Sequence, residues 1–192
     1  RNEGGHASRP RKDNAIFELA ALLRNIEAMQ FPAQANDITR TTLRLRANAI
    51  EATEPELAAT LRRFADNPAD SASASKLKAS GRFEADISTT CAATKLDAGH
   101  AENALPQRAT ATINCRIFPG TSISDVQAML ERAGGKPNAT WKKISTHIEA
   151  PISKPRADVT AAVKSGLALH YHGVPVAPYQ EAGATDGMWF RN

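Results

Sequence analysis

The sequence predicts an α+β protein in which helices cover one face of an antiparallel sheet. Apolar residues recur at three- and four-residue spacing over 13–29, 36–66 and 122–134, which is the period of an amphipathic helix. They alternate with polar residues over 83–93 and 110–118, which is the period of a strand with one buried face. We therefore expect the order helix, strand, strand, helix, strand.

The composition is typical of a folded chain that can bury a real hydrophobic core. Of the 192 residues, 42% are hydrophobic, enough for one domain or for one domain plus a fragment of another. The net charge of +4 comes from interspersed acidic and basic residues, so we expect no nucleic-acid partner. No apolar run approaches the ~20 residues that cross a bilayer, so we expect no membrane partner. Because the chain opens with Arg1, we expect its native start upstream.

Helices dominate the first third of the chain. Asp13 is placed to cap a helix that runs to about Met29. The helical period continues over 36–66 in two helices, and Pro55 suits the first turn of the second. Residues 67–80 are small and polar, and we interpret them as a mobile linker.

The two alternating segments are expected to pair as antiparallel strands around a loop centred near Asn103. In a symmetric hairpin, Cys91 and Cys115 become cross-strand neighbours, close enough to raise the question of a disulfide. We expect two small buried residues with reduced thiols, and the bridge is the alternative.

The remaining chain predicts two more elements of the sheet layer and then changes in character. Ser122 is placed to start a helix that Gly134 and Gly135 end, and 141–148 is expected to be a strand. A helix around 159–167 and an extended stretch at 173–178 follow. We interpret 1–150 as one domain and 151–192 as a piece of another.

Two polar residues in turns are candidates for binding a carbonyl group. His6 stands in Gly-Gly-His-Ala-Ser, where glycines let the backbone approach a ligand and the imidazole can donate to a developing oxyanion. The alternative is an ordinary exposed loop histidine. Asn103 precedes Ala-Leu-Pro, and its amide can hold a carbonyl or carboxylate or can cap its own turn.

Arg116 is a candidate for binding a carboxylate. It projects from the polar face of the second expected strand, where its guanidinium is a rigid fork. The alternative is a cross-strand ion pair with Glu84 or Asp86.

A glycine-bounded turn near the end of the chain is the last candidate. Gly183, Ala184, Thr185 and Asp186 precede Gly187, and such a turn can form an anion nest from free backbone N–H groups. The alternative is a capped helix start. The histidines show no ligand spacing, and no His-x-Asp or Cys-x-x-Cys motif occurs, so we expect this chain to bind no metal.

Taken in order, three stretches resemble the zinc-dependent aminoacylase, carboxypeptidase and desuccinylase family of metallopeptidases, and most closely its carboxypeptidase S-like branch. They are Gly-Gly-His-Ala-Ser-Arg-Pro at 4–10 with Asp-Asn-Ala at 13–15, Ala-Gly-His-Ala-Glu-Asn-Ala-Leu-Pro at 98–106 running into Asn-Cys-Arg-Ile-Phe-Pro-Gly at 114–120, and Gly-Val-Pro-Val at 173–176 with Gly-Ala-Thr-Asp-Gly at 183–187. The resemblance covers nearly the whole chain apart from 36–80, which looks like an insertion.

The resemblance implies a two-domain subunit in which a ferredoxin-like lid or dimerisation domain is inserted into an α/β catalytic domain with two zinc ions. Residues 1–150 would be the lid, and 151–192 the partial return into the catalytic domain. The resemblance further implies a homodimer that hydrolyses an amide bond in a small peptide or N-acyl amino acid.

The resemblance also assigns roles to the candidate residues. His6 would reach the partner's active site and polarise the scissile carbonyl, while Asn103 and Arg116 would hold the substrate's carbonyl and carboxylate. The turn at 183–187 would line the same pocket. The zinc ligands and the glutamate base would lie before residue 1 and after Asn192, so this stretch by itself would be inactive and hold no zinc.

Two other functions are open on the sequence. One is a stand-alone α+β dimerisation or binding module without catalysis. The other is a nucleic-acid-binding sheet, but such sheets expose aromatic residues on central strands, and 110–118 offers only Phe118 at its end.

Overall fold

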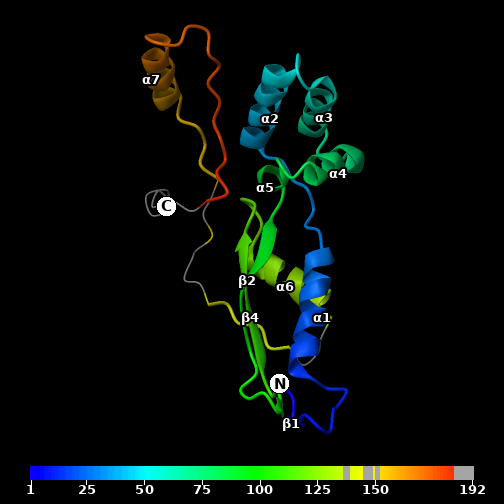
Figure 1. Ribbon diagram of the computed structural model, residues 1–192. Coiled ribbons are helices and arrows are strands. Elements are labelled where there is room, and N and C mark those ends of the chain that lie inside the picture. Colours follow the sequence, from blue (N-terminus) through cyan, green and yellow to red (C-terminus); the bar gives the residue numbers. More distant parts are fainter. Residues whose placement is uncertain (136–138, 145–148, 150–151, 184–192) are drawn as a thin grey trace. The chain divides into compact units, whose positions relative to one another are not determined.

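The computed structural model describes residues 1–135, 139–144, 149 and 152–183, which form an α+β structure (Figure 1). The chain divides into two compact units. The sheet unit comprises Arg1–Phe31, Thr90–Ile117 and the described part of 121–149, and the helical unit comprises Pro32–Thr89, Phe118–Gly120 and the described part of 150–192. These units interleave along the sequence, and the assignment of 151–192 to a catalytic domain stays a prediction.

The sheet unit is built on the antiparallel pair β2 (Thr90–Ala98) and β4 (Ala109–Arg116), which confirms the expected hairpin pairing. The register runs from Thr90 opposite Arg116 to Ala98 opposite Ala109, with an irregularity between Ala93 and Lys95. A second, short pair joins β1 (Gly5–His6) to β3 (Ala104–Leu105).

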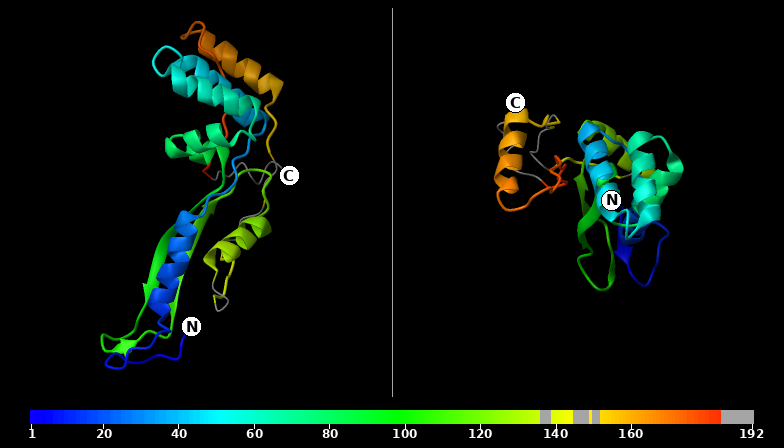
Figure 2. Two further views of the ribbon diagram at one scale, coloured as in Figure 1. Left: turned by 90° about the vertical axis from the view of Figure 1, so that its right-hand side faces the viewer. Right: turned by 90° about the horizontal axis from the view of Figure 1, so that it is seen from above.

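The helices α1 (Ala15–Ala28) and α6 (Ile123–Gly134) pack on each other, and Figure 2 shows α1 lying along the two long strands. The buried side chains between them are Leu22, Ile26, Phe31, Val126 and Leu130, with Cys91, Ile113, Cys115 and Ile117 from the strands. Since these strand residues alternate along β4 and into Ile117, they form one face of the hairpin, and the predicted helix-covered face is confirmed.

The helix caps agree with the expectation at α6 and differ at α1. The Ser122 hydroxyl accepts from the Asp125 N–H, and Gly135 ends α6 with a left-handed φ of 60°. At α1 the cap is Asn14, whose side chain accepts from the backbone N–H groups of the second and third helical residues. Asp13 instead pairs with Arg11, because its carboxylate matches the guanidinium fork.

The expected reduced thiols are wrong in this structure, because Cys91 and Cys115 form a disulfide. The two residues are register partners with their Cα atoms 4.1 Å apart, the spacing of a non-hydrogen-bonded antiparallel pair. Both side chains therefore lie on the helix-covered face, where they join the core.

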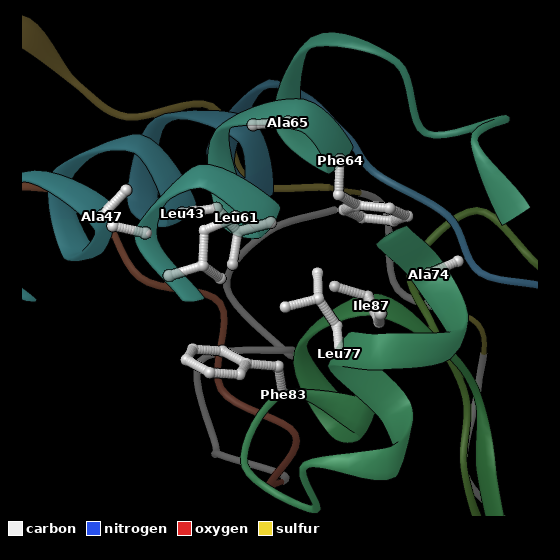
Figure 3. Packing of buried hydrophobic residues seen from close by; sticks show 10 residues of the cluster. Leu43, Ala47, Leu61, Phe64, Ala65, Ala74, Leu77, Phe83 and Ile87 are labelled. Carbon is white, nitrogen blue, oxygen red and sulfur yellow. The ribbon is translucent and has the colours of Figure 1, made fainter. Parts of the chain in front are cut away.

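The helical unit contains α2 (Asp37–Ile50), α3 (Pro55–Asp66), α4 (Ser71–Ala79) and the single turn α5 (Glu84–Ile87). The first two confirm the predicted helices, and Pro55 opens α3 as expected. Figure 3 shows how the four helices enclose a separate core. Its buried residues are Leu43, Ala47, Ala58, Leu61, Phe64, Ala65, Ala74, Leu77, Phe83 and Ile87.

Two predictions about this region are corrected. Residues 67–80 are no simple linker, because Asp70 caps α4 and Leu77 inserts fully into the core. The first strand begins at Thr90 and not near 83, because Phe83 and Ile87, four residues apart, are buried in the helical core. A spacing of four satisfies both periods, so packing decides between them.

In the last part of the chain one expected helix is confirmed, whereas the described residues form no further strand. The expected helix is α7 (Ala157–Ala168), and none of its side chains is buried. The strand predicted at 141–148 is not formed by Trp141–Ile144, where Trp141 packs against the sheet-unit core. Residues 145–148 lie outside the described residues.

Reduction of the disulfide should lower the free energy of unfolding by about 3 kcal/mol, because the bridge joins residues 24 positions apart and limits the unfolded chain. Urea unfolding with and without a reductant, followed through the amides of β2 and β4 by NMR, measures the difference. The double variant Cys91→Ser/Cys115→Ser is the control and should not respond to the reductant. An equal midpoint for the native chain under both conditions would contradict the prediction.

Candidate functional site

His6 is held by backbone pairing at the end of the sheet unit that carries the 99–108 loop. It lies opposite Ala104 in the β1–β3 pair, and the next N–H, of Ala7, donates to the Asn103 carbonyl over 2.8 Å. Gly4 precedes this pair with φ of 79°, and a Cβ there would stand 2.5 Å from Cγ of Gln107. The positive φ would strain any residue with a side chain at this position, and its Cβ would displace the Gln107 side chain, so the glycine in the motif has a conformational and a steric reason.

The imidazole of His6 is oriented by its own turn. The backbone N–H of Ser8 donates to Nδ1 over 3.2 Å, and the Ser8 hydroxyl lies 2.8 Å from the same nitrogen. A nitrogen that accepts from an amide N–H carries no proton, so the proton of the neutral ring is on Nε2. The side chain is exposed, and Nε2–H is therefore available to donate to an external group.

Asn103 lies beside His6 as a consequence of the same pairing. Its carbonyl accepts from the residue after His6, and its side chain is exposed. Within the described part of the chain, its amide group makes no hydrogen bond to the turn, so the turn-capping alternative has no contact to support it. The structure thus brings two of the predicted site residues together.

Arg116 is not part of that group. It ends β4 opposite Thr90, while the 99–108 loop lies beyond the other end of the strand. With eight residues in β4, Arg116 lies about 23 Å along the strand from Ala109. The guanidinium is exposed, and Asp86, one of the two partners in the alternative ion pair, pairs with Arg46 instead.

The final predicted turn is described only at its first residue. Gly183 is exposed, and its N–H donates to Oε1 of Glu181 over 3.2 Å. Ala184, Thr185 and Asp186 lie outside the described residues, so their predicted role stays a prediction.

The helical unit holds a polar cluster that the sequence did not reveal. Arg46 of α2 pairs with Asp86 of α5 over 2.7 Å, and its guanidinium lies over the ring of Tyr179 at 5.3 Å. Burial raises the pKa of Asp86, and the ion pair with Arg46 opposes that rise. In the sequence, Asp86 is 40 positions from Arg46 and 93 positions from Tyr179, and no motif links the three residues.

The described residues contain neither a candidate metal site nor a candidate membrane span. Within them, no three His, Cys, Asp or Glu side chains are grouped so that they could hold a metal ion. None of the described helices combines the length and the apolar character that a membrane span requires.

Comparison with known proteins identifies the family. The chain is 28% identical over 190 residues to a Dictyostelium discoideum protein named probable carboxypeptidase S-like 2. That match covers 98% of this chain but 36% of the relative, so the chain spans about a third of the relative's length. No solved structure matches the chain. A family model described as the peptidase dimerisation domain matches residues 1–142, and the chain therefore belongs to this metallopeptidase-associated family.

Proposed function

We propose that this chain is the lid and dimerisation part of a metal-dependent hydrolase that cleaves an amide bond in a peptide or an N-acyl amino acid. The family match and the name of the Dictyostelium relative support the reaction class. The observation that carries the proposal is His6, an exposed imidazole whose Nε2–H has no partner among the described residues and which the β1–β3 pair holds beside Asn103.

In this proposal His6 stabilises the charge that develops on the scissile carbonyl oxygen. A positioned donor at that oxygen is worth more in the transition state than in the ground state, because the negative charge forms only as the amide is attacked. Ser8 keeps Nδ1 occupied, so the ring offers Nε2–H without reorganisation. Asn103 adds an amide donor at the same end of the unit.

The distance to Arg116 supports a dimeric site. A dipeptide spans about 7 Å when extended, whereas Arg116 lies about 23 Å along β4 from the loop end. One small substrate therefore cannot contact His6 and Arg116 of the same chain. A second copy related by twofold symmetry can bring its own His6 and Asn103 to the Arg116 of the first.

The metal ions implied by the family do not fit the described residues, which offer no group of three suitable donors. In the proposal the donors come from other parts of a longer polypeptide, and bound zinc would supply a Lewis acid there. The role proposed for His6 is to stabilise the developing oxyanion, and Asn103 and Arg116 are proposed to bind the substrate; none of these roles needs a metal ligand from this chain.

Helix α7 supports the proposal that 151–192 belongs to a catalytic domain. A stable helix of this length normally buries an apolar stripe, yet Val159 and Val163, four residues apart, are 50% and 45% exposed. We propose that the catalytic part of a longer polypeptide covers this stripe. The share of the relative that the chain spans leaves ample length for such a domain.

Helix α1 supplies a surface for a second copy of this chain. Its inner face is buried on the sheet, but Phe17 is 71% exposed, and the neighbouring Ile16 is 40% exposed. The family is named for dimerisation, and an aromatic residue on an exposed helix face is typical of interface cores. We propose that the dimer forms through α1 and the adjacent sheet edge.

Replacing His6 by Ala in a longer polypeptide that carries the metal ligands should lower kcat by roughly 10²- to 10³-fold, because one oxyanion donor is lost. Metal content and the dimer should be unchanged. Steady-state kinetics with a peptide or N-acyl amino acid and metal analysis of the same samples make the test. Turnover equal to that of the native enzyme would remove His6 from the mechanism.

Replacing Phe17 by Asp should shift the chain from dimer to monomer, because a charge would be desolvated at the centre of the interface. Sedimentation equilibrium across a range of concentrations measures the change. Leu169→Asp is the matched control, since Leu169 is 76% exposed on the helical unit and should leave the dimer intact. A native chain that is monomeric at high concentration would contradict the proposed dimer.

A further inference from the structure

Arg11 joins two places in the chain that lie on either side of His6. Its Nη1 lies 2.9 Å from Oε2 of Glu3, which precedes β1. Its Nε and Nη2 donate to the two carboxylate oxygens of Asp13 over 2.9 and 3.1 Å, directly before the Asn14 cap of α1. All three guanidinium nitrogens therefore have an acidic partner, and we call this group of three side chains the Arg11 clamp.

Before His6, the chain is held to the 99–108 loop by hydrogen bonds of its own. The Asn2 N–H donates to the Gln107 carbonyl, and the Gln107 side chain donates to the Glu3 carbonyl, each over 2.8 Å. The β1–β3 pair continues this attachment as far as His6. This side of the loop is therefore fixed without Arg11.

After His6, the support is different. The N–H of Ala7 still donates to the Asn103 carbonyl, and the N–H of Arg9 closes a tight turn on the His6 carbonyl over 2.9 Å. From that turn to the start of α1, the hydrogen bonds found among the described residues are those of the Arg11 clamp. The polar contacts that return the chain from the His6 turn to α1 thus depend on Arg11.

The geometry of the clamp distinguishes it from an ordinary surface ion pair. A single exposed pair contributes little to stability, but a bidentate fork that also meets a second carboxylate is geometrically specific. The stem of Arg11 also lies beside β1, since a Cβ built on Gly5 would stand 3.9 Å from its Cδ. Two carboxylates already match the charge of Arg11, so the residue is suited to holding the loop and not to binding an anionic substrate.

We propose that Arg11 is a positioning residue, which fixes the His6 turn by joining the segment before β1 to the start of α1. The imidazole depends on this turn, because the N–H of Ser8 reaches Nδ1 only while residues 6–9 keep their conformation. The positioning of the ring follows from these contacts. Its effect on catalysis rests on the proposed function, which makes His6 the oxyanion donor.

Loss of Arg11 should raise the pKa of Asp13, because the hydrogen bond from Arg11 is the largest cause that lowers it. The variant Arg11→Met keeps an apolar stem and removes the fork. Lys12→Met is the matched control, since Lys12 is the exposed neighbour and forms none of the ion pairs found among the described residues. Carboxyl NMR titration measures the change, and an equal Asp13 pKa in Arg11→Met and the native chain would contradict the assigned pair.

NMR relaxation on the full chain tests the positioning. In the native chain the backbone order parameters of residues 6–13 should be near the rigid value of about 0.85, and in Arg11→Met they should fall below about 0.6. Glu3→Gln should act in the same direction but less, because the fork to Asp13 remains, and Lys12→Met should have no effect. Unchanged amide shifts of β2 and β4 show that each variant is folded. Equal order parameters in Arg11→Met and the native chain would overturn the positioning role.

Kinetics of a longer, metal-loaded polypeptide then test whether the clamp acts through His6. Arg11→Met should lower kcat by about tenfold or more with KM nearly unchanged, because it misplaces a group that binds the transition state. In the His6→Ala background the same substitution should have no further effect, since a positioning residue acts only through the group that it positions. An equal loss in both backgrounds would overturn this role of Arg11.

The inference and the proposed function fail in different ways. Full turnover of His6→Ala would remove His6 from the mechanism and with it the catalytic effect of Arg11, while the relaxation result would still decide whether Arg11 holds the turn. Full turnover of Arg11→Met beside an impaired His6→Ala would overturn the positioning role alone.

Discussion

Antiparallel pairing of β2 with β4 is the interaction on which the sheet unit depends, because it assigns every strand residue to one of two faces. Cys91, Ile113 and Cys115 are placed under α1 and α6, and Arg116 is placed on the opposite, exposed side. A shift by one residue would exchange these faces. The disulfide between directly opposed residues holds this register, since it closes only when Cys91 faces Cys115.

The same pairing sets the distance between Arg116 and the loop that carries Asn103 and holds His6. The 99–108 loop connects the paired strands and carries Asn103 and β3, and β3 in turn holds His6. Arg116 is at the other end of the hairpin. The two groups of proposed site residues on a single chain are therefore separated by the length of a strand, which is the reason for proposing that the site forms in a dimer.

The helical unit is packed around a core of its own. Among the described residues, the buried clusters of the helical unit and the sheet unit have no member in common. The Asn36 side chain and the Thr42 hydroxyl of α2 donate hydrogen bonds to Gln180 and Pro178, which lie more than 130 residues later in the chain.

The amino-acid sequence by itself determined the elements whose signals are local. The periods of α2, α3 and α6, the cap at Ser122, the opposition of Cys91 to Cys115 and the family motifs around His6 were all readable, because each depends on neighbours in the sequence or on symmetry about one loop. Where Phe83 and Ile87 fit two periods at once, only the tertiary core decided for a helical turn. Likewise, the disulfide, α4 and the Arg46 cluster depend on which side chains become buried together. Such burial is a property of the packed chain, and spacing along the sequence does not specify it.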